Sequence, residues 1–138
     1  MHIHRILFLS PINHLSIMAE GWASKLGAPT LTFASAAYFQ ESEDHLPISA
    51  MKEVNIDITH LQAKHVTPQL LKEADVIIFI YDFIQDEQPN ITSFHQKKIL
   101  LWNIPNPLYI QDPIEKWAAY QIACDQLADY VKRLKSSI

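Results

Sequence analysis

The chain has 138 residues, of which 49% are hydrophobic, and a formal net charge of −4 at pH 7. This length suits one domain with one core, so we expect residues 1–138 to form a single domain. Nucleic-acid binding needs a clustered basic surface, and a membrane-spanning helix needs about 20 apolar residues in a row. The sequence has neither, so we expect no nucleic-acid partner and no membrane partner.

The single cysteine, Cys124, excludes a disulfide within the chain and agrees with a reducing compartment. We therefore expect a cytoplasmic protein. The seven histidines show neither the helical spacing nor the cysteine partners that structural metal sites use. We expect no metal ion and no cofactor.

The first part of the chain predicts a strand, a helix and a second strand. Residues 3–9 are an apolar run that fits a buried strand stopped by Pro11. Apolar side chains then recur at helical spacing over residues 15–26, and Gly27 suits the end of that helix. Residues 31–36 predict the next strand.

The middle of the chain predicts two helices and two further strands. A short amphipathic helix is expected over residues 48–54, and another begins at Pro68 with Thr67 as its N-cap. The apolar runs 76–80 and 99–102 are the most strand-like segments of the sequence.

The closing segment predicts one long helix that starts at Pro113. Its apolar stripe includes Trp117 and Cys124, so we expect a buried, unreactive thiol and a largely buried Trp117, with Trp22 buried in the same way on the first helix. Strands that alternate with helices indicate an α/β fold, with a four-stranded parallel sheet in a three-layer, doubly wound arrangement and helices on both faces.

Ligands of such sheets bind beyond the carboxyl ends of the strands. Segments 10–16, 81–85 and 103–109 should therefore meet in one crevice. The polar and aromatic side chains expected to line it are Ser10, Asn13, His14, Ser16, Tyr81, Asp82, Asn106 and Tyr109.

Residues 6–22, with the sequence ILFLSPINHLSIMAEGW, resemble the opening of thioredoxin-coupled arsenate reductases and low-molecular-weight tyrosine phosphatases. In those proteins a strand leads into a C-x5-R loop, followed by Ser and a helix that begins with Met-Ala-Glu-Gly. Further matches occur in the same order at residues 35–37, 51–66, 74–80 and 101–107. The resemblance spans nearly the whole chain and implies the fold of low-molecular-weight phosphotyrosine phosphatases.

The resemblance also implies three catalytic roles, which this chain fills with other residue types. The family's cysteine nucleophile falls at Leu9 or Ser10, and its oxyanion-binding arginine falls at Leu15 or Ser16. The aspartate that protonates the leaving group is replaced by Asn106, because the sequence reads Asn-Pro where the family has Asp-Pro.

The rest of the pattern is altered as well. The C-x5-R loop is one residue short, and its glycine is replaced by Pro11 or Ile12. The two further cysteines of the arsenate reductases would fall near Tyr81 and Gln88, where this chain has none. We therefore expect no turnover of phosphate esters or arsenate.

The sequence favours a catalytically inactive homologue that works as a binding or regulatory module, with a weakly bound small anion or a protein as its partner. One alternative is a hydrolase of different chemistry, with Ser10 as nucleophile, His14 as base and Asp82 as the residue that orients the base. It lacks the nucleophile-elbow pattern G-x-S-x-G. Residual phosphatase activity is the other alternative.

Overall fold

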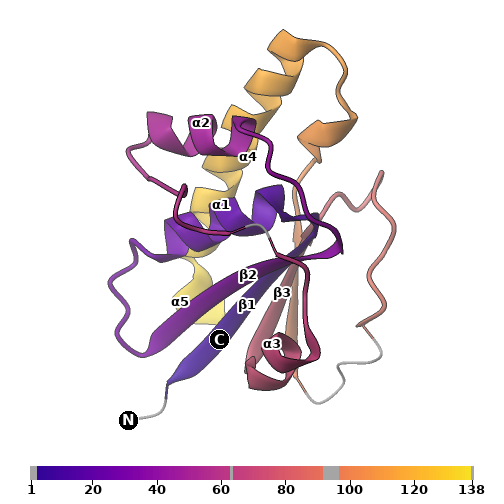
Figure 1. The fold of residues 1–138 in the computed structure, drawn as a ribbon. Coiled ribbons are helices and arrows are strands. Elements are labelled where there is room, and N and C mark those ends of the chain that lie inside the picture. Colours follow the sequence, from indigo (N-terminus) through magenta and orange to yellow (C-terminus); the bar gives the residue numbers. More distant parts are fainter. Residues whose placement is uncertain (1–2, 63, 92–96, 138) are drawn as a thin grey trace.

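The computed structural model describes residues 3–62, 64–91 and 97–137, and none of the helices in these ranges is long and apolar enough to cross a membrane. At the centre lies one parallel sheet of four strands (Figure 1). Its strands are β1 (His4–Ile12), β2 (Leu31–Gln40), β3 (Val76–Tyr81) and β4 (Lys98–Asn103), in the order β2-β1-β3-β4.

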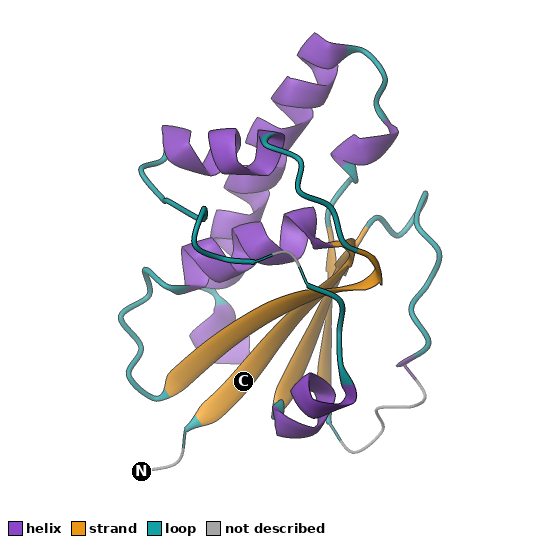
Figure 2. Cartoon of the chain, viewed as in Figure 1, coloured by secondary structure: helices purple, strands orange, loops and turns teal. Residues whose placement is uncertain are grey.

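Helices cover both faces of this sheet (Figure 2). One face carries α1 (Asn13–Ala23), α2 (Leu46–Glu53), α4 (Pro113–Lys132) and the short α5 (Leu134–Ser137), and the other carries α3 (Pro68–Glu73). A 3-10 helix, η2 (Pro107–Tyr109), follows β4. The predicted α/β architecture with helices on both faces is confirmed.

The core is split in two by the alternation of side chains along the central strands. Ile6 and Phe8 of β1 face α1 and α4, whereas Leu7 and Leu9 face the side of α3. Every residue of β3 is buried, as a strand covered on both faces requires.

β1 runs on past the predicted stop at Pro11. Its pairing with β3 ends at Leu9, and its register with β2 shifts between Ser10 and Ile12. Pro11 therefore sits at an irregularity where the ladder needs no N–H from it, which is one of the few places where a strand accepts proline.

α1 begins at Asn13, directly after β1 and two residues before the helical spacing predicted from residue 15. Asn13, His14 and Ser16 belong to the first turns of the helix. The strand and the helix meet without an intervening stretch of loop.

β2 is longer than predicted and ends at Gln40. Its outer side pairs with a short segment further along the chain. The Ala37 N–H donates to the Lys64 carbonyl, and the Val66 N–H donates to the Ala37 carbonyl, both over 2.8 Å. This parallel bridge, centred on His65, covers part of the edge of β2.

α3 and α4 start at the predicted prolines, Pro68 and Pro113, whereas α2 starts at Leu46, two residues before the prediction. Thr67 caps α3 by accepting a hydrogen bond from the Leu70 N–H, as predicted. The stripe of α4 is buried as predicted from Cys124 onward, but nearer the start of the helix Tyr120 is fully buried and Trp117 is half-buried. Trp22 on α1 is half-buried too, so both tryptophans are less buried than expected.

Candidate functional site

Ser10 and Leu9, the two positions to which the resemblance assigns the family's nucleophile, both lie in β1, and Leu9 is a buried core residue. Ser10 lies near the carboxyl end of the strand. Its side chain is fully buried; the hydroxyl donates to the Ile12 carbonyl over 2.6 Å and accepts from the Ser16 N–H over 3.0 Å. The Ser16 hydroxyl lies 3.1 Å from both the Asn13 and Ala36 carbonyls. Ser10 and Ser16 therefore fasten the strand to the helix instead of lining an open crevice.

Leu15, at one of the two candidate arginine positions, is a buried member of the core beneath α1. Its side chain contributes apolar packing. Ser16, the other candidate, is held by the hydrogen bonds just described.

Asp82 follows β3 and organises the turn after it. Its carboxylate accepts hydrogen bonds of 3.0 Å from the N–H groups of Ile84, Gln85 and Asn106. Burial of Asp82 disfavours the ionised form, but the N–H groups of Asn106, Gln85 and Ile84 outweigh it and lower the pKa. Asp82 is thus an ionised structural acceptor that joins the ends of β3 and β4.

Asp86 is the second buried carboxylate at this end of the sheet. It accepts a hydrogen bond from the Asp82 N–H at 2.8 Å, two from the Asn106 amide at 3.2 and 3.3 Å, and one from the Tyr109 hydroxyl at 2.5 Å. The bond to Asp86, assisted by burial, raises the pKa of Tyr109 to about 12. Sequence reasoning missed Asp86, the residue that links Asn106 and Tyr109.

Tyr81 is buried at the end of β3, and its ring contacts that of Phe83 at a centroid distance of 4.7 Å. It belongs to the core on the α3 side. Of the eight side chains predicted to line the crevice, Tyr109 is the exposed one, at 48%. The other seven are buried.

His14 is buried in the first turn of α1, on the face of the sheet opposite to α3. Its Nδ1 lies 2.7 Å from the Tyr120 hydroxyl, and its Nε2 is buried without a hydrogen-bond partner. Burial lowers the pKa of His14, opposed by the charge of Asp44 and assisted by that of Lys116. The imidazole is consequently neutral at pH 7.

Ser10, His14 and Asp82, the three residues of the hydrolase alternative, form their hydrogen bonds with other groups. Ser10 bonds to backbone atoms of β1 and α1, His14 to Tyr120, and Asp82 to the segment after β3 and to Asn106. The structure brings them to the same end of the sheet without linking them.

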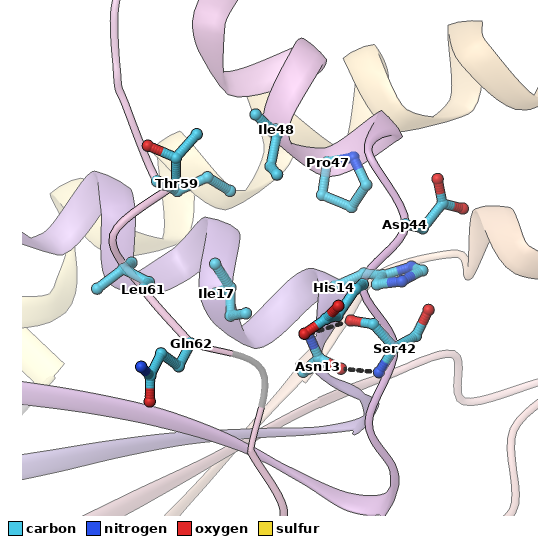
Figure 3. Close-up of a pocket in the computed structure, with 12 residues that line it drawn as sticks. Asn13, His14, Ile17, Ser42, Asp44, Pro47, Ile48, Thr59, Leu61 and Gln62 are labelled. Atoms are coloured by element: carbon cyan, nitrogen blue, oxygen red, sulfur yellow. Dashed lines mark hydrogen bonds between the residues drawn. The ribbon is translucent and has the colours of Figure 1, made fainter.

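Asn13 and His14 also line a pocket of about 520 Å³ between α1 and α2 (Figure 3). The Asn13 amide donates to the Ser42 carbonyl over 2.9 Å and accepts from the Ser42 N–H over 2.5 Å. The lining residues are Asn13, His14, Ile17, Ser42, Glu43, Asp44, Pro47, Ile48, Ile58, Thr59, Leu61 and Gln62. The segments 41–45 and 58–62, which enclose the pocket, were not predicted to take part in a site.

The fold defines a class, the three-layer α/β proteins of the low-molecular-weight phosphatase type. A solved structure described as an arsenate reductase in the phosphate binding state matches with a TM-score of 0.78 and 21% identity, over 99% of both chains. A low-molecular-weight protein tyrosine phosphatase from T. tengcongensis matches with a TM-score of 0.74 and 21% identity, over 98% of this chain and 99% of that one. At these identities the likeness shows the fold alone.

Sequence similarity is more specific. An arsenate reductase from Oceanobacillus iheyensis is 30% identical over 118 residues, which cover 85% of this chain and 84% of that protein. No family model matches the chain. The chain therefore belongs to the arsenate reductase family.

Proposed function

We propose that this chain is a member of the arsenate reductase family that has lost the family's chemistry and serves as a binding or regulatory module. The observation that carries the proposal is the buried Ser10 hydroxyl at the end of β1, hydrogen-bonded on both sides. Serine cannot form the thiolate that the family uses as its nucleophile. The Ser10 hydroxyl is also bonded to groups of its own chain.

The one cysteine of the chain supports the same conclusion. Cys124 lies on α4 with its sulfur 3.6 Å from that of Met51, inside the apolar core. Burial raises the pKa of the Cys124 thiol. Reactive cysteines have a lowered pKa and some exposure, so Cys124 is suited to packing.

Binding of an oxyanion at the start of α1 is also disfavoured. The family uses backbone N–H groups at a helix N-terminus to hold the anion, together with an arginine. Here Pro11 has no N–H, the Ser16 N–H is used by Ser10, and Leu15 is packed in the core.

The turnover assay is the direct test. We expect no hydrolysis of p-nitrophenyl phosphate or p-nitrophenyl acetate, and no arsenate reduction with thioredoxin, above a blank without protein. Ser10→Ala and Cys124→Ser are the control variants, with folding checked by circular dichroism. Phosphate release that disappears in the Ser10→Ala variant would establish a serine-based phosphatase, and ester hydrolysis lost in Ser10→Ala would support the hydrolase alternative.

Binding of vanadate provides a second measurement on the same proposal. The site has no arginine, Pro11 has no N–H, and the Ser16 N–H is bonded to Ser10. Phosphate and vanadate should therefore bind no more tightly than millimolar at neutral pH. Micromolar vanadate binding in titration calorimetry, with NMR shifts centred on residues 10–16, would show that an oxyanion site is intact.

A further inference from the structure

The pocket between α1 and α2 is separate from the buried hydroxyls at the end of β1. Figure 3 shows Ile17 of α1 on one side, Pro47 and Ile48 of α2 above it, and residues 59–62 closing the far end. A volume of about 520 Å³ lies within the range of roughly 300–1,000 Å³ that small-molecule sites occupy.

The pocket wall combines apolar and polar side chains. Ile17 and Ile58 are buried, and Ile48 and Leu61 are half-buried, so together with Pro47 they offer a surface for an apolar body. Small-molecule sites generally combine such a wall with a few fixed polar groups that orient the ligand.

The polar groups of this pocket are negative or neutral. Glu43 and Asp44 are among the lining residues, which include no lysine and no arginine. A positive charge acts on His14 from Lys116, and the His45 ring lies beside Asp44, with 3.6 Å between its Nδ1 and the Asp44 carboxylate. Asp44 also accepts a hydrogen bond from the Leu46 N–H, which fixes the position of its carboxylate.

His14 adds a polar atom that lacks a partner. The residue is 5% exposed, it lies in the pocket wall beneath Asp44, and its Nε2 has no hydrogen bond. Since the neutral ring carries one proton and Nδ1–H can donate to the Tyr120 hydroxyl, Nε2 can present its lone pair. The acceptor that results lies near the carboxylate of Asp44, whose charge acts on His14.

We propose that this pocket binds a small organic amine, with its ammonium group at Asp44, Glu43 and His14 and its apolar body against Ile17, Ile48 and Ile58. The inference rests on the proposed binding role and assigns it a site and a ligand class. It differs from the anion expected from the sequence, because the lining includes two carboxylates, whereas an anion would need cations.

The site is also held in shape before any ligand enters. Both ends of the Asn13 amide are hydrogen-bonded to the backbone of Ser42, which ties the acidic segment 41–45 to α1. A preformed site loses less conformational entropy on binding than one that must be ordered.

The test compares three ligands of the same shape and different charge: benzylamine, benzyl alcohol and benzoate. Titrations followed by ¹H–¹⁵N NMR at pH 7.5 should show benzylamine binding about tenfold more tightly than benzyl alcohol, a difference of about 1.4 kcal/mol. Benzoate should bind most weakly. The shifts should map to residues 13–17, 42–48 and 58–62, and the His14 Nε2 resonance should move with benzylamine.

Two variants remove charge from the pocket while keeping shape, namely Asp44→Asn and Glu43→Gln. Each should reduce the preference for benzylamine, and asparagine retains the oxygen that Leu46 uses. Glu41→Gln is the matched control, because it removes a charge from the same segment at a residue outside the pocket lining.

Three results would overturn the inference: equal affinity for benzylamine and benzyl alcohol, shifts that map elsewhere, or an equal effect of Glu41→Gln. Since the titration measures no turnover, it can fail while the assays still support loss of the family's chemistry. Enzymatic turnover, in turn, leaves the titration result unaffected.

Discussion

At the scale of single residues, His14 was expected to line a crevice, and in the structure it is buried against Tyr120. The Tyr120 hydroxyl meets the imidazole over 2.7 Å, across 106 residues of sequence. Burial, the larger effect, raises the pKa of Tyr120, as does Asp44, so the hydroxyl keeps its proton at neutral pH. The pair is therefore neutral and buried.

This pair predicts a pH dependence of stability. The pKa of His14 is lower in the folded chain than the unfolded value of 6.5. Below pH 6.5 the unfolded chain therefore takes up the proton first, so acidification favours unfolding. The contribution of His14 to stability is full above pH 6.5 and is lost as the pH falls through its folded pKa.

Urea unfolding between pH 7.5 and 5 should show this loss, and His14→Gln, which has no titrating ring, should show a shallower slope over the same interval. All other ionisable groups are the same in both proteins, so the difference in slope isolates His14. Identical slopes in the two proteins would contradict a lowered pKa.

The sequence predicted Asn13 and His14 as site residues but could not predict their surroundings. Tyr120 carries no local signal that connects it to His14, because such a contact is set by how α4 packs on α1. Asp44 had a usable signal, since an aspartate shortly before Leu46-Pro47 is typical of a helix start. Its place at a pocket mouth depends on tertiary packing.

At the scale of elements, Gly21 explains why the Met-Ala-Glu-Gly sequence of α1 has a glycine inside a helix. A Cβ atom at this position would lie 2.7 Å from Ile58 Cγ2, 3.0 Å from Met51 Cε and 3.2 Å from Ile56 Cγ2. The glycine thus allows residues 51–58 to pack closely on α1, and Ile58 forms part of the pocket wall.

Gly21→Ala should destabilise the protein despite the better helix propensity of alanine. The propensity gain is about 1 kcal/mol, whereas overpacking of a buried contact typically costs about 1–3 kcal/mol. In an Ile58→Ala background the crowding is relieved, so Gly21→Ala should cost less there. A double-mutant cycle from urea unfolding measures the coupling, and additive effects within about 0.3–0.5 kcal/mol would contradict it.

The ends of elements were harder to predict than the elements themselves. Proline usually stops a strand, which is why β1 was predicted to end before Pro11. The observed strand continues because β1 no longer pairs with β3 beyond Leu9, so Pro11 has no N–H to supply on that side. Whether a strand can continue through a proline therefore depends on the order of the strands in the sheet, which the sequence does not reveal.

At the scale of the whole molecule, the two faces of the sheet are covered unequally. The α1 side carries α1, α2, α4 and α5 and the larger core cluster, whereas α3 contributes no fully buried residue to the other side. The alternation of strands and helices predicted the layers correctly, because a fully apolar strand such as β3 must be covered on both faces. It could not predict how thick each layer is.

Hydrogen exchange should reflect this asymmetry. Helices with few buried contacts open locally, so the amides of α3 should exchange orders of magnitude faster than those of β3. Thr67→Ala removes the cap of α3, a change that costs about 1 kcal/mol in typical helices, and should accelerate exchange in α3. Equal acceleration in β3 would show that α3 opens only with the whole molecule.

The bridge between Ala37 and residues 64–66 has a consequence for self-association. An uncovered edge strand offers free N–H and C=O groups to a strand of another chain, which is a common start of aggregation. β2 is an edge strand that carries an exposed Phe39 near its end. Since the N–H and carbonyl of Ala37 are already bonded within the chain, another molecule cannot extend the sheet there unless it first displaces residues 64–66.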